Sequence, residues 1–281
     1  MTHNQAKKER GFSLIELLTV IAILTIVMGV VFREIIRVQQ RFRTEEAKLD
    51  VFQEARNFMD RFVRDLHQAG YPGQRLYEPA AITMSPKIND RRVAAGLVLV
   101  RNTDLLFESD IDGDGQVDSI RYTLVTGTGG NCPCTIRRSQ VIKINGTSPL
   151  SQPTNYFSIV GNIINSGGSG GSGPNGSRSI CFPNPVGGGC SATSPFATAT
   201  GVVQISNDTV YGPYRSLPVF QAFDRNGLAV TLPIDINTNP TALKNIRTIR
   251  VTMNVLATAP DPQTLMRPAV SLTASARVQN N

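Results

Sequence analysis

An apolar stretch near the N-terminus constrains this chain more than any other feature of its sequence. Residues 12–32 read FSLIELLTVIAILTIVMGVVF and contain no proline and one charged residue, Glu16. A helix of this length spans about 30 Å, which is the thickness of a bilayer's hydrocarbon core. The sequence therefore predicts a transmembrane helix. Because an unpaired carboxylate in hydrocarbon is costly, Glu16 needs a partner or must reach the membrane edge.

The apolar stretch differs from a cleavable secretory signal. The residues that follow it, FREIIRVQQRF, lack the small-x-small pattern of such a cleavage site. We therefore expect the segment to be retained. Basic residues flank it on both sides, so the positive-inside rule gives no orientation. Four cysteines beyond it favour an oxidising compartment for the C-terminal part and a cytoplasmic N-terminal tail.

The helical pattern continues well beyond the apolar stretch. Residues 33–69 contain no proline and no glycine, and Gly70, Pro72 and Gly73 then end the pattern. We expect one helix over residues 12–69, about 85 Å long. Its second part, residues 33–70, is amphipathic and is expected to pack on the rest of the chain. The expected apolar stripe comprises Phe42, Leu49, Phe52, Ala55, Phe58, Met59, Phe62, Val63 and Leu66.

The sequence KKERGFSLIELLTVIAIL resembles the class III signal of type IV prepilins. The resemblance implies a leader over residues 1–11, cut after Gly11 by a prepilin peptidase, and methylation of the new N-terminal residue, Phe12. It also implies that Glu16 pairs with the N-terminal amine of a neighbouring subunit. A buried carboxylate beside a buried ammonium is tolerated, whereas either one alone is not.

A second segment, FMDRFVRDLHQAGYP, resembles the helix end of minor pilins of the PilW type and of J-type pseudopilins. The segments IRTIRVTMNVLA and MRPAVSLTASARVQN are similar to their closing strands. Major pilins often carry proline where Arg33 stands here, which counts against a bulk fibre subunit. The resemblance implies a non-enzymatic minor pilin that acts as a structural or priming subunit.

Partners and location follow from the same resemblance. The implied partners are other major and minor pilins, the prepilin peptidase, the inner-membrane assembly platform, and membrane lipid before assembly. The implied location is the inner membrane, with the C-terminal domain in the periplasm, and later the extracellular pilus. A type II secretion pseudopilin is the first alternative, although the chain's length and long loops favour the pilus. A fibre-borne adhesin or DNA-uptake subunit is the second.

Residues 71–281 are rich in β-strand patterns separated by turn residues. They predict an antiparallel sheet on the amphipathic half of the helix, an α+β fold. Residues 165–177, NSGGSGGSGPNGS, predict a flexible loop. The expected strands are residues 96–101, 105–108, 119–125, 139–144, 156–164, 201–205, 228–232, 246–256 and 269–278.

One motif has the residue order of a cation-binding loop. The segment DIDGDGQVDSIRY places aspartates in the order of an EF-hand loop, but Arg121 stands where a bidentate glutamate is needed. Strand-like flanks also argue against an EF-hand. The segment predicts either a weak calcium-binding loop that closes a β-hairpin or a polar Asp-Gly turn. The candidate ligands are Asp110, Asp112, Asp114, Gln116 (through its carbonyl) and Asp118.

The four cysteines, Cys132, Cys134, Cys181 and Cys190, are disulfide candidates. A bridge between Cys132 and Cys134 is the least attractive, because one intervening residue strains it. A bridge between Cys181 and Cys190 closes easily but leaves the other two without an obvious partner. Bridges between the two pairs use all four. The spacings do not match the CxxC pairs of zinc sites.

Enzyme and nucleic-acid classes receive little support from the sequence. Of the two histidines, His3 lies in the leader and His67 on the amphipathic helix, so no catalytic Ser-His-Asp or Cys-His set can be assembled. The formal net charge of +7 arises largely around the apolar segment. No Lys/Arg run is interleaved with aromatic residues, which argues against nucleic acid as a partner.

Overall fold

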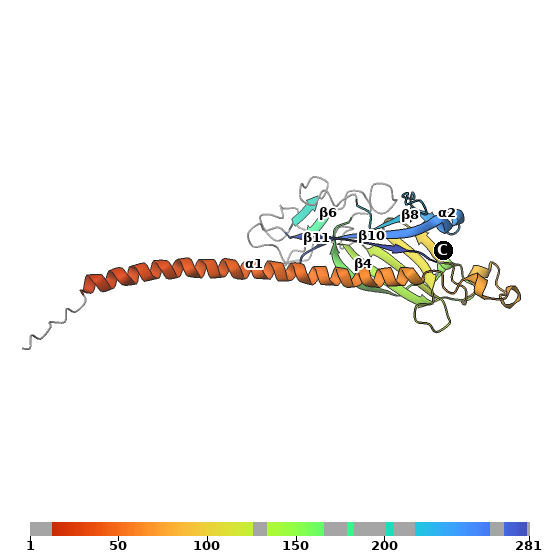
Figure 1. Cartoon of the computed structure of the whole chain (residues 1–281), viewed down its shortest axis with the longest axis horizontal. Coiled ribbons are helices and arrows are strands. Elements are labelled where there is room, and N and C mark those ends of the chain that lie inside the picture. The colour runs from red at the N-terminus through yellow and green to blue at the C-terminus, as the bar shows by residue number, and fades with distance from the viewer. Residues whose placement is uncertain are drawn as a thin grey trace, which may run out of the picture. The chain divides into compact units, whose positions relative to one another are not determined.

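A computed structural model describes residues 13–125, 134–165, 179–182, 201–204, 217–258 and 267–279, with only the backbone for 179–182 and 201–204 (Figure 1). The chain divides into two compact units, Met1–Glu46 and Ala47–Asn281. The first contains the apolar part of a long helix, and the second contains the rest of that helix together with a β-sheet.

The helix α1 runs without interruption from Leu14 to Gln68. Its first turn begins where the Ser13 carbonyl accepts hydrogen bonds from the backbone N–H groups of Glu16 and Leu17, at 3.0 and 3.2 Å. It ends before Gly70, which adopts a φ of 82°, a left-handed conformation that glycine reaches without strain. The predicted long helix is thus confirmed, while its expected first residue, Phe12, lies outside the described residues.

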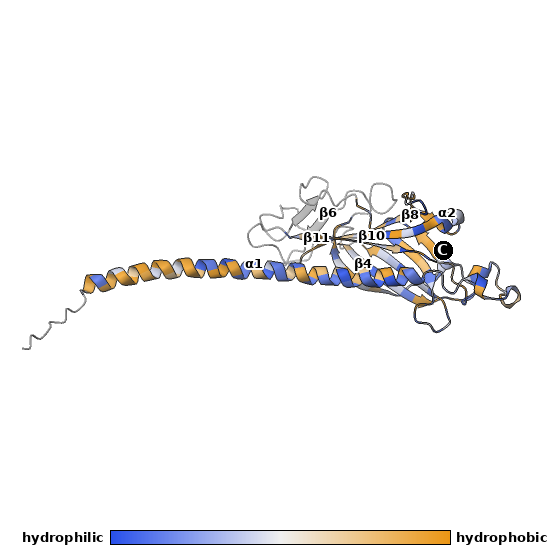
Figure 2. Ribbon diagram, viewed as in Figure 1, coloured by the Kyte–Doolittle hydropathy of each residue, from blue (hydrophilic) through white to orange (hydrophobic). Residues whose placement is uncertain are grey.

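In the first unit, the large apolar side chains of α1 are exposed. Figure 2 shows hydrophobic residues along this part of the helix. By length and composition, this part of the helix can cross a membrane. A helix that is apolar all round needs an apolar environment to cover it. Exposed apolar side chains continue past residue 32 to Val38, so the predicted boundary between an apolar and an amphipathic part of α1 stays a prediction.

The second unit is built on one antiparallel sheet of nine strands (Figure 1). The strand order is β11-β10-β5-β4-β3-β2-β1-β9, and β8 also pairs with β10. Strands β6 and β7 form a separate pair. The bounds are β1 Leu97–Val100, β2 Asp104–Ser109, β3 Asp118–Val125, β4 Cys134–Ile142, β5 Tyr156–Ile163, β6 Ser179–Phe182, β7 Gly201–Gln204, β8 Phe220–Asp224, β9 Ile234–Asp235, β10 Ile246–Leu256 and β11 Ala269–Arg277, with a short helix α2 at Pro240–Asn245 and 3-10 turns at Gln74–Leu76, Pro79–Ala81, Lys87–Asn89 and Pro149–Ser151.

The core lies between the second half of α1 and one face of the sheet. Phe62 is at its centre, with ring centroids 5.4 Å from Tyr122 on β3 and 5.7 Å from Phe220 on β8. Phe58 stacks on Phe62 at 5.8 Å. Burial of these rings supplies the main attachment of helix to sheet. The fold is therefore pilin-like α+β, as the sequence predicts. The buried apolar residues of the helix are Val51, Ala55, Phe58, Met59, Phe62 and Leu66.

The predicted apolar stripe is wrong at its N-terminal end. Phe42, Leu49 and Phe52 are exposed, and Val51 is buried instead. Apolar residues spaced by three, four or seven positions can form more than one line along a helix, and the spacing alone does not say which line faces the sheet. The sheet covers the line through Val51 and Phe58, which leaves Leu49 and Phe52 away from it.

One predicted strand is also wrong. Residues 228–232 form only an isolated bridge between Ala229 and Phe223, and Leu228 is exposed. The strand lies earlier, at β8, which ends in a tight turn. In this turn Asp224 Oδ1 accepts the backbone N–H groups of Asn226 and Leu228, at 2.8 and 2.9 Å. Strand β4 is also longer than predicted, because it begins at Cys134 instead of residue 139.

Candidate functional site

The start of α1 carries the first candidate residues. Glu16 lies in the first turn and is exposed, and its backbone carbonyl accepts a bond from Thr19 Oγ1 at 2.9 Å. Among the described residues, no side chain pairs with the Glu16 carboxylate. Gly11 and Phe12 lie outside the described residues. Within the described part of the chain, a carboxylate without a side-chain partner thus lies at the beginning of an apolar helix, where its burial would require a cationic partner.

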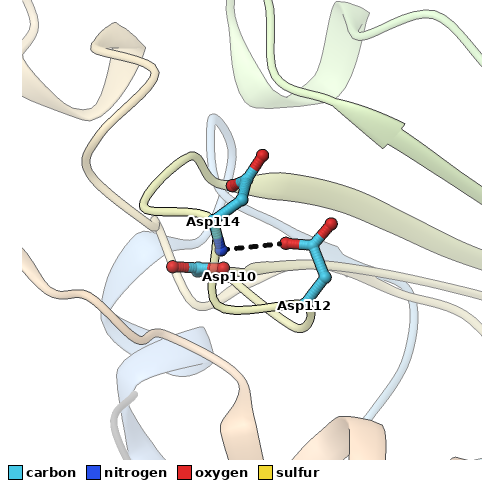
Figure 3. Close-up of side chains that lie close together, drawn as sticks. All are labelled: Asp110, Asp112 and Asp114. Atoms are coloured by element: carbon cyan, nitrogen blue, oxygen red, sulfur yellow. Dashed lines mark hydrogen bonds between the residues drawn. The ribbon is translucent and has the colours of Figure 1, made fainter.

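The aspartate motif forms the connection of a β-hairpin. Strands β2 and β3 pair antiparallel and end at Ser109 and Asp118, so strands flank the loop as expected. Asp110, Asp112 and Asp114 each offer a carboxylate oxygen within 4.8 Å of the other two (Figure 3). Oxygens bound to one calcium ion at 2.3–2.6 Å lie at most about 5 Å apart. These three carboxylates can therefore contact a single cation.

Hydrogen bonds inside the loop hold the same three carboxylates. Asp110 accepts the backbone N–H of Gly113 at 2.8 Å and that of Gly115 at 3.1 Å. Asp112 accepts the N–H of Asp114 at 3.2 Å, the bond drawn in Figure 3. Gly113 and Gly115 have φ values of 76° and 82°, so both need the left-handed conformation. The turn is therefore held by its own backbone donors as well as by any cation.

Asp118 lies outside this group of three carboxylates. Asp118 is buried on β3, and its Oδ2 accepts a bond from Gln140 Nε2 at 2.7 Å. Burial, together with the charges of Asp112, Asp114 and Asp110, raises the pKa of Asp118 to about 6, although the hydrogen bond from Gln140 acts in the opposite direction. The Gln116 side chain bonds to Asp114 Oδ2 at 3.3 Å. The structure thus brings three of the four proposed carboxylates together, and their charges act on Asp118. The role of the Gln116 carbonyl stays a prediction.

The cysteine candidates are described only in part. Cys134 is buried at the start of β4 and is disulfide-bonded. Cys132 and Cys190 lie outside the described residues, and Cys181 is described only by its backbone in β6. Which cysteine bridges to which stays a prediction.

Comparison with known proteins decides the class of the N-terminal site. Residues 6–32 match the family model of the prokaryotic N-terminal methylation motif. Residues 6–32 are the N-terminal motif of a prepilin of the type IV pilin and pseudopilin superfamily. The match covers the second half of the leader and the apolar segment, including Gly11, Phe12 and Glu16. The comparisons found no similar curated protein and no similar solved structure.

The motif indicates where the prepilin is located and which proteins it meets. The apolar part of α1 anchors it in the inner membrane, and the sheet unit belongs to the periplasm or the pilus. Its general partners are a prepilin peptidase and other pilins, and the superfamily consists of structural proteins, not enzymes.

A buried polar network that the sequence did not reveal attaches α1 to the sheet of the prepilin. Asp65 on α1 accepts bonds at Oδ2 from Tyr122 at 2.6 Å and from Arg138 Nε at 3.0 Å. Arg138 Nη2 also lies 2.9 Å from the same oxygen, as an ion-pair contact without a hydrogen bond. Arg138 Nη1 donates to Gln140, which in turn holds Asp118 beside the aspartate loop. The network therefore runs from the helix to the loop.

A second buried pair attaches the segment after α1 to strand β2. Lys143 Nζ lies 2.6 Å from Glu108 Oε2 and donates to the Val93 carbonyl at 2.8 Å. Glu108 Oε2 also accepts the backbone N–H of Ala95 at 2.9 Å. Burial raises the pKa of Glu108 and lowers that of Lys143, while their mutual attraction opposes both shifts. The pair fixes residues 93–95 beside β2, next to the aspartate hairpin.

Proposed function

We propose that this prepilin is a minor pilin of the PilW type, a structural and priming subunit of a type IV pilus. It is cut after Gly11 and methylated at Phe12, and its apolar helix then passes from the bilayer into the fibre. The Glu16 carboxylate within the methylation motif supports this proposal most directly, because it has no side-chain partner among the described residues and its burial requires a cation. In the fibre, that cation is the N-terminal amine of a neighbouring subunit.

Two features favour a minor subunit. Arg33 interrupts the apolar surface of α1 where a bulk fibre subunit often has proline, and it carries a charge at the end of the spanning segment. The nine-stranded sheet, with a further strand pair β6–β7, is also a large outer unit to repeat along a fibre. Both are easier to accommodate at or near a fibre end than at every shaft position.

The first experiment determines the N-terminal sequence and intact mass of the protein from cell membranes. A chain that begins with methylated Phe12 supports the processing part of the proposal. A chain that begins with Met1, in cells with an active prepilin peptidase, contradicts it. A Gly11→Trp variant serves as the uncleaved reference in the same cells.

Deletion of the gene separates pilus from secretion machinery. Loss of surface pili with normal secretion of exoproteins supports the pilus, and the opposite result assigns the chain to a type II secretion pseudopilus. Mass spectrometry of sheared fibres tests whether the protein is present in them. Retardation of DNA by the full chain in detergent, with a steep salt dependence, would instead favour a DNA-uptake subunit.

We also propose that the aspartate loop binds calcium weakly. The three carboxylate oxygens within 4.8 Å of one another support this, since they match the spacing of ligands around one ion. Three carboxylates without a bidentate glutamate provide few of the six to eight oxygens that calcium takes, so the expected dissociation constant is about millimolar. The test is a calcium titration that follows the pKa of the Asp118 carboxyl by NMR.

A further inference from the structure

A basic face follows the apolar segment of α1 directly. Arg33, Arg37 and Arg41 are spaced by four residues and are all exposed. Residues four apart lie next to each other on a helix, so the three guanidinium groups share one face that is about 12 Å long. Arg37 pairs with Glu34 through Nη1 at 2.8 Å, whereas Arg33 and Arg41 have no carboxylate partner in the described part of the chain.

The position of this face follows from the membrane anchor. The apolar segment ends at Phe32, so Arg33 lies at the hydrocarbon boundary and Arg37 about 6 Å beyond it. The headgroup layer on each side of a bilayer is about 5–8 Å thick. Helix side chains lean toward the N-terminus of their helix, which here is the direction of the bilayer. Even Arg41, about 12 Å from the boundary, can therefore extend its guanidinium toward the headgroups.

The surroundings of the three arginines are those of an interfacial segment. Exposed Ile35, Ile36 and Val38 continue the apolar surface between them. Residues 33–43 contain four arginines and one glutamate, so this stretch of the helix has a formal charge of +3. Guanidinium groups bind phosphate through paired hydrogen bonds, and basic residues next to a spanning helix are attracted to anionic lipid.

We propose that Arg33, Arg37 and Arg41 form a binding face for the headgroup phosphates of acidic phospholipids in the periplasmic leaflet. This face holds α1 at a fixed depth in the bilayer while the prepilin waits for assembly. The inference rests on membrane anchoring alone, and it holds equally for a pilus subunit and for a secretion pseudopilin. Continuity with the membrane-spanning segment and the charge of the face identify lipid as the occupant.

The test uses the full chain in nanodiscs that contain spin-labelled phosphatidylglycerol or spin-labelled phosphatidylcholine. The measured quantity is the fraction of each lipid that the protein restricts in motion. The variant R33Q/R41Q removes the two arginines that lack a carboxylate partner. The control R56Q/R64Q removes the same charge from exposed positions on α1 that lie far beyond the spanning segment. Helix content and incorporation into nanodiscs are checked for both variants by circular dichroism and by gel.

We expect the wild-type chain to prefer phosphatidylglycerol, and we expect the preference to weaken at high salt. Each arginine is worth about fivefold in lipid association, so R33Q/R41Q should lower the preference by about tenfold or more, while the control leaves it unchanged. Equal restriction of both lipids by the wild-type chain would overturn the proposal, as would an equal loss in the control. If the wild-type chain restricts both lipids equally and R33Q/R41Q is absent from fibres, the three arginines contact a neighbouring subunit instead of lipid.

Discussion

Arg138 on β4 donates a hydrogen bond from Nε to Asp65 Oδ2 on α1, at 3.0 Å, in a place where both side chains are buried. The Tyr122 hydroxyl donates to the same oxygen at 2.6 Å. Burial, followed by the Asp65 charge, raises the pKa of Tyr122, so the phenol keeps its proton and remains a donor. Two donors converging on one carboxylate fix the rotation of the helix against the sheet, which ring packing alone leaves less specific.

Replacing Asp65 with alanine should destabilise the sheet unit by about 3–5 kcal/mol, because the Arg138 charge then stays buried without its partner. Chemical denaturation of the full chain in detergent, followed by tyrosine fluorescence, measures the loss. Asp60→Ala is the matched control, since Asp60 is exposed on the same helix and should change stability by less than about 0.5 kcal/mol. Equal losses in the two variants would contradict this role of Asp65.

Phe62 and Leu49 test which line of α1 faces the sheet. Phe62→Ala should cost about 3–5 kcal/mol, because its ring fills the core between Tyr122 and Phe220. Leu49 is exposed, so Leu49→Ala should leave the stability of the isolated prepilin nearly unchanged. The same denaturation measurement compares the two. A large loss from Leu49→Ala would place the other line of the helix on the sheet.

The long helix and most of the sheet could be predicted from local patterns. Residues 246–256 alternate as a strand, and β10 has the same bounds. The rotation of α1 could not be predicted, because Leu49 and Val51 fit helical spacing equally well and only the sheet selects between them. The buried charges were missed for a similar reason. Asp65 and Arg138 are 73 residues apart, and nothing near either one in sequence marks it as buried.

The place of the aspartate hairpin and its connection of two strands could be predicted from the sequence, but the position of Asp118 outside the group of three carboxylates could not. The spacing of Asp110, Asp112 and Asp114 follows from the turn itself, which the two glycines make. The separation of Asp118 depends on Gln140, which reaches it from the neighbouring strand. A contact across strands is decided by register, and a single segment of sequence does not contain that register.

Asp118 should give the stability of the prepilin a specific pH dependence. Its folded-state pKa of about 6 lies above the ordinary value of 3.8, so the folded state binds the proton more tightly than the unfolded state. The stabilisation of the folded state by proton binding at Asp118 is therefore full below about pH 4, and it is lost as the pH rises through 6. The loss is at most about 3 kcal/mol. Asp118→Asn should remove it, and the difference between the two denaturation curves against pH isolates it from other groups.

Calcium should act on the same group. A cation held by Asp110, Asp112 and Asp114 cancels the negative charge beside Asp118 and should lower its pKa. Titration of the Asp118 carboxyl by NMR, with and without about 10 mM calcium, measures this change, and magnesium serves as the control because it prefers a stricter octahedral site. A triple aspartate-to-asparagine variant of the loop should show no response to calcium. If calcium leaves the Asp118 pKa unchanged in the wild-type chain, the loop is an Asp-Gly turn without a cation site.

Glu16 provides the most direct test of assembly. Glu16→Gln keeps the size and polarity of the side chain but removes its charge. In an apolar fibre core, the N-terminal ammonium of the neighbouring subunit would then lack its counter-charge, at a cost of about 3–5 kcal/mol per contact. We therefore expect the variant to be cut after Gly11 at the wild-type rate but to be nearly absent from sheared fibres. Immunoblots of membrane and fibre fractions measure both.

Glu34→Gln is the matched control for this experiment, because Glu34 is an exposed glutamate on the same helix whose partner, Arg37, lies within its own chain. An exposed pair of this kind is worth less than about 1 kcal/mol, so the control should enter fibres normally. Recovery of Glu16→Gln in fibres at the level of the control would show that no charge pair at this position drives assembly. Exclusion of both variants would show that net charge along α1 matters, and that Glu16 has no special partner.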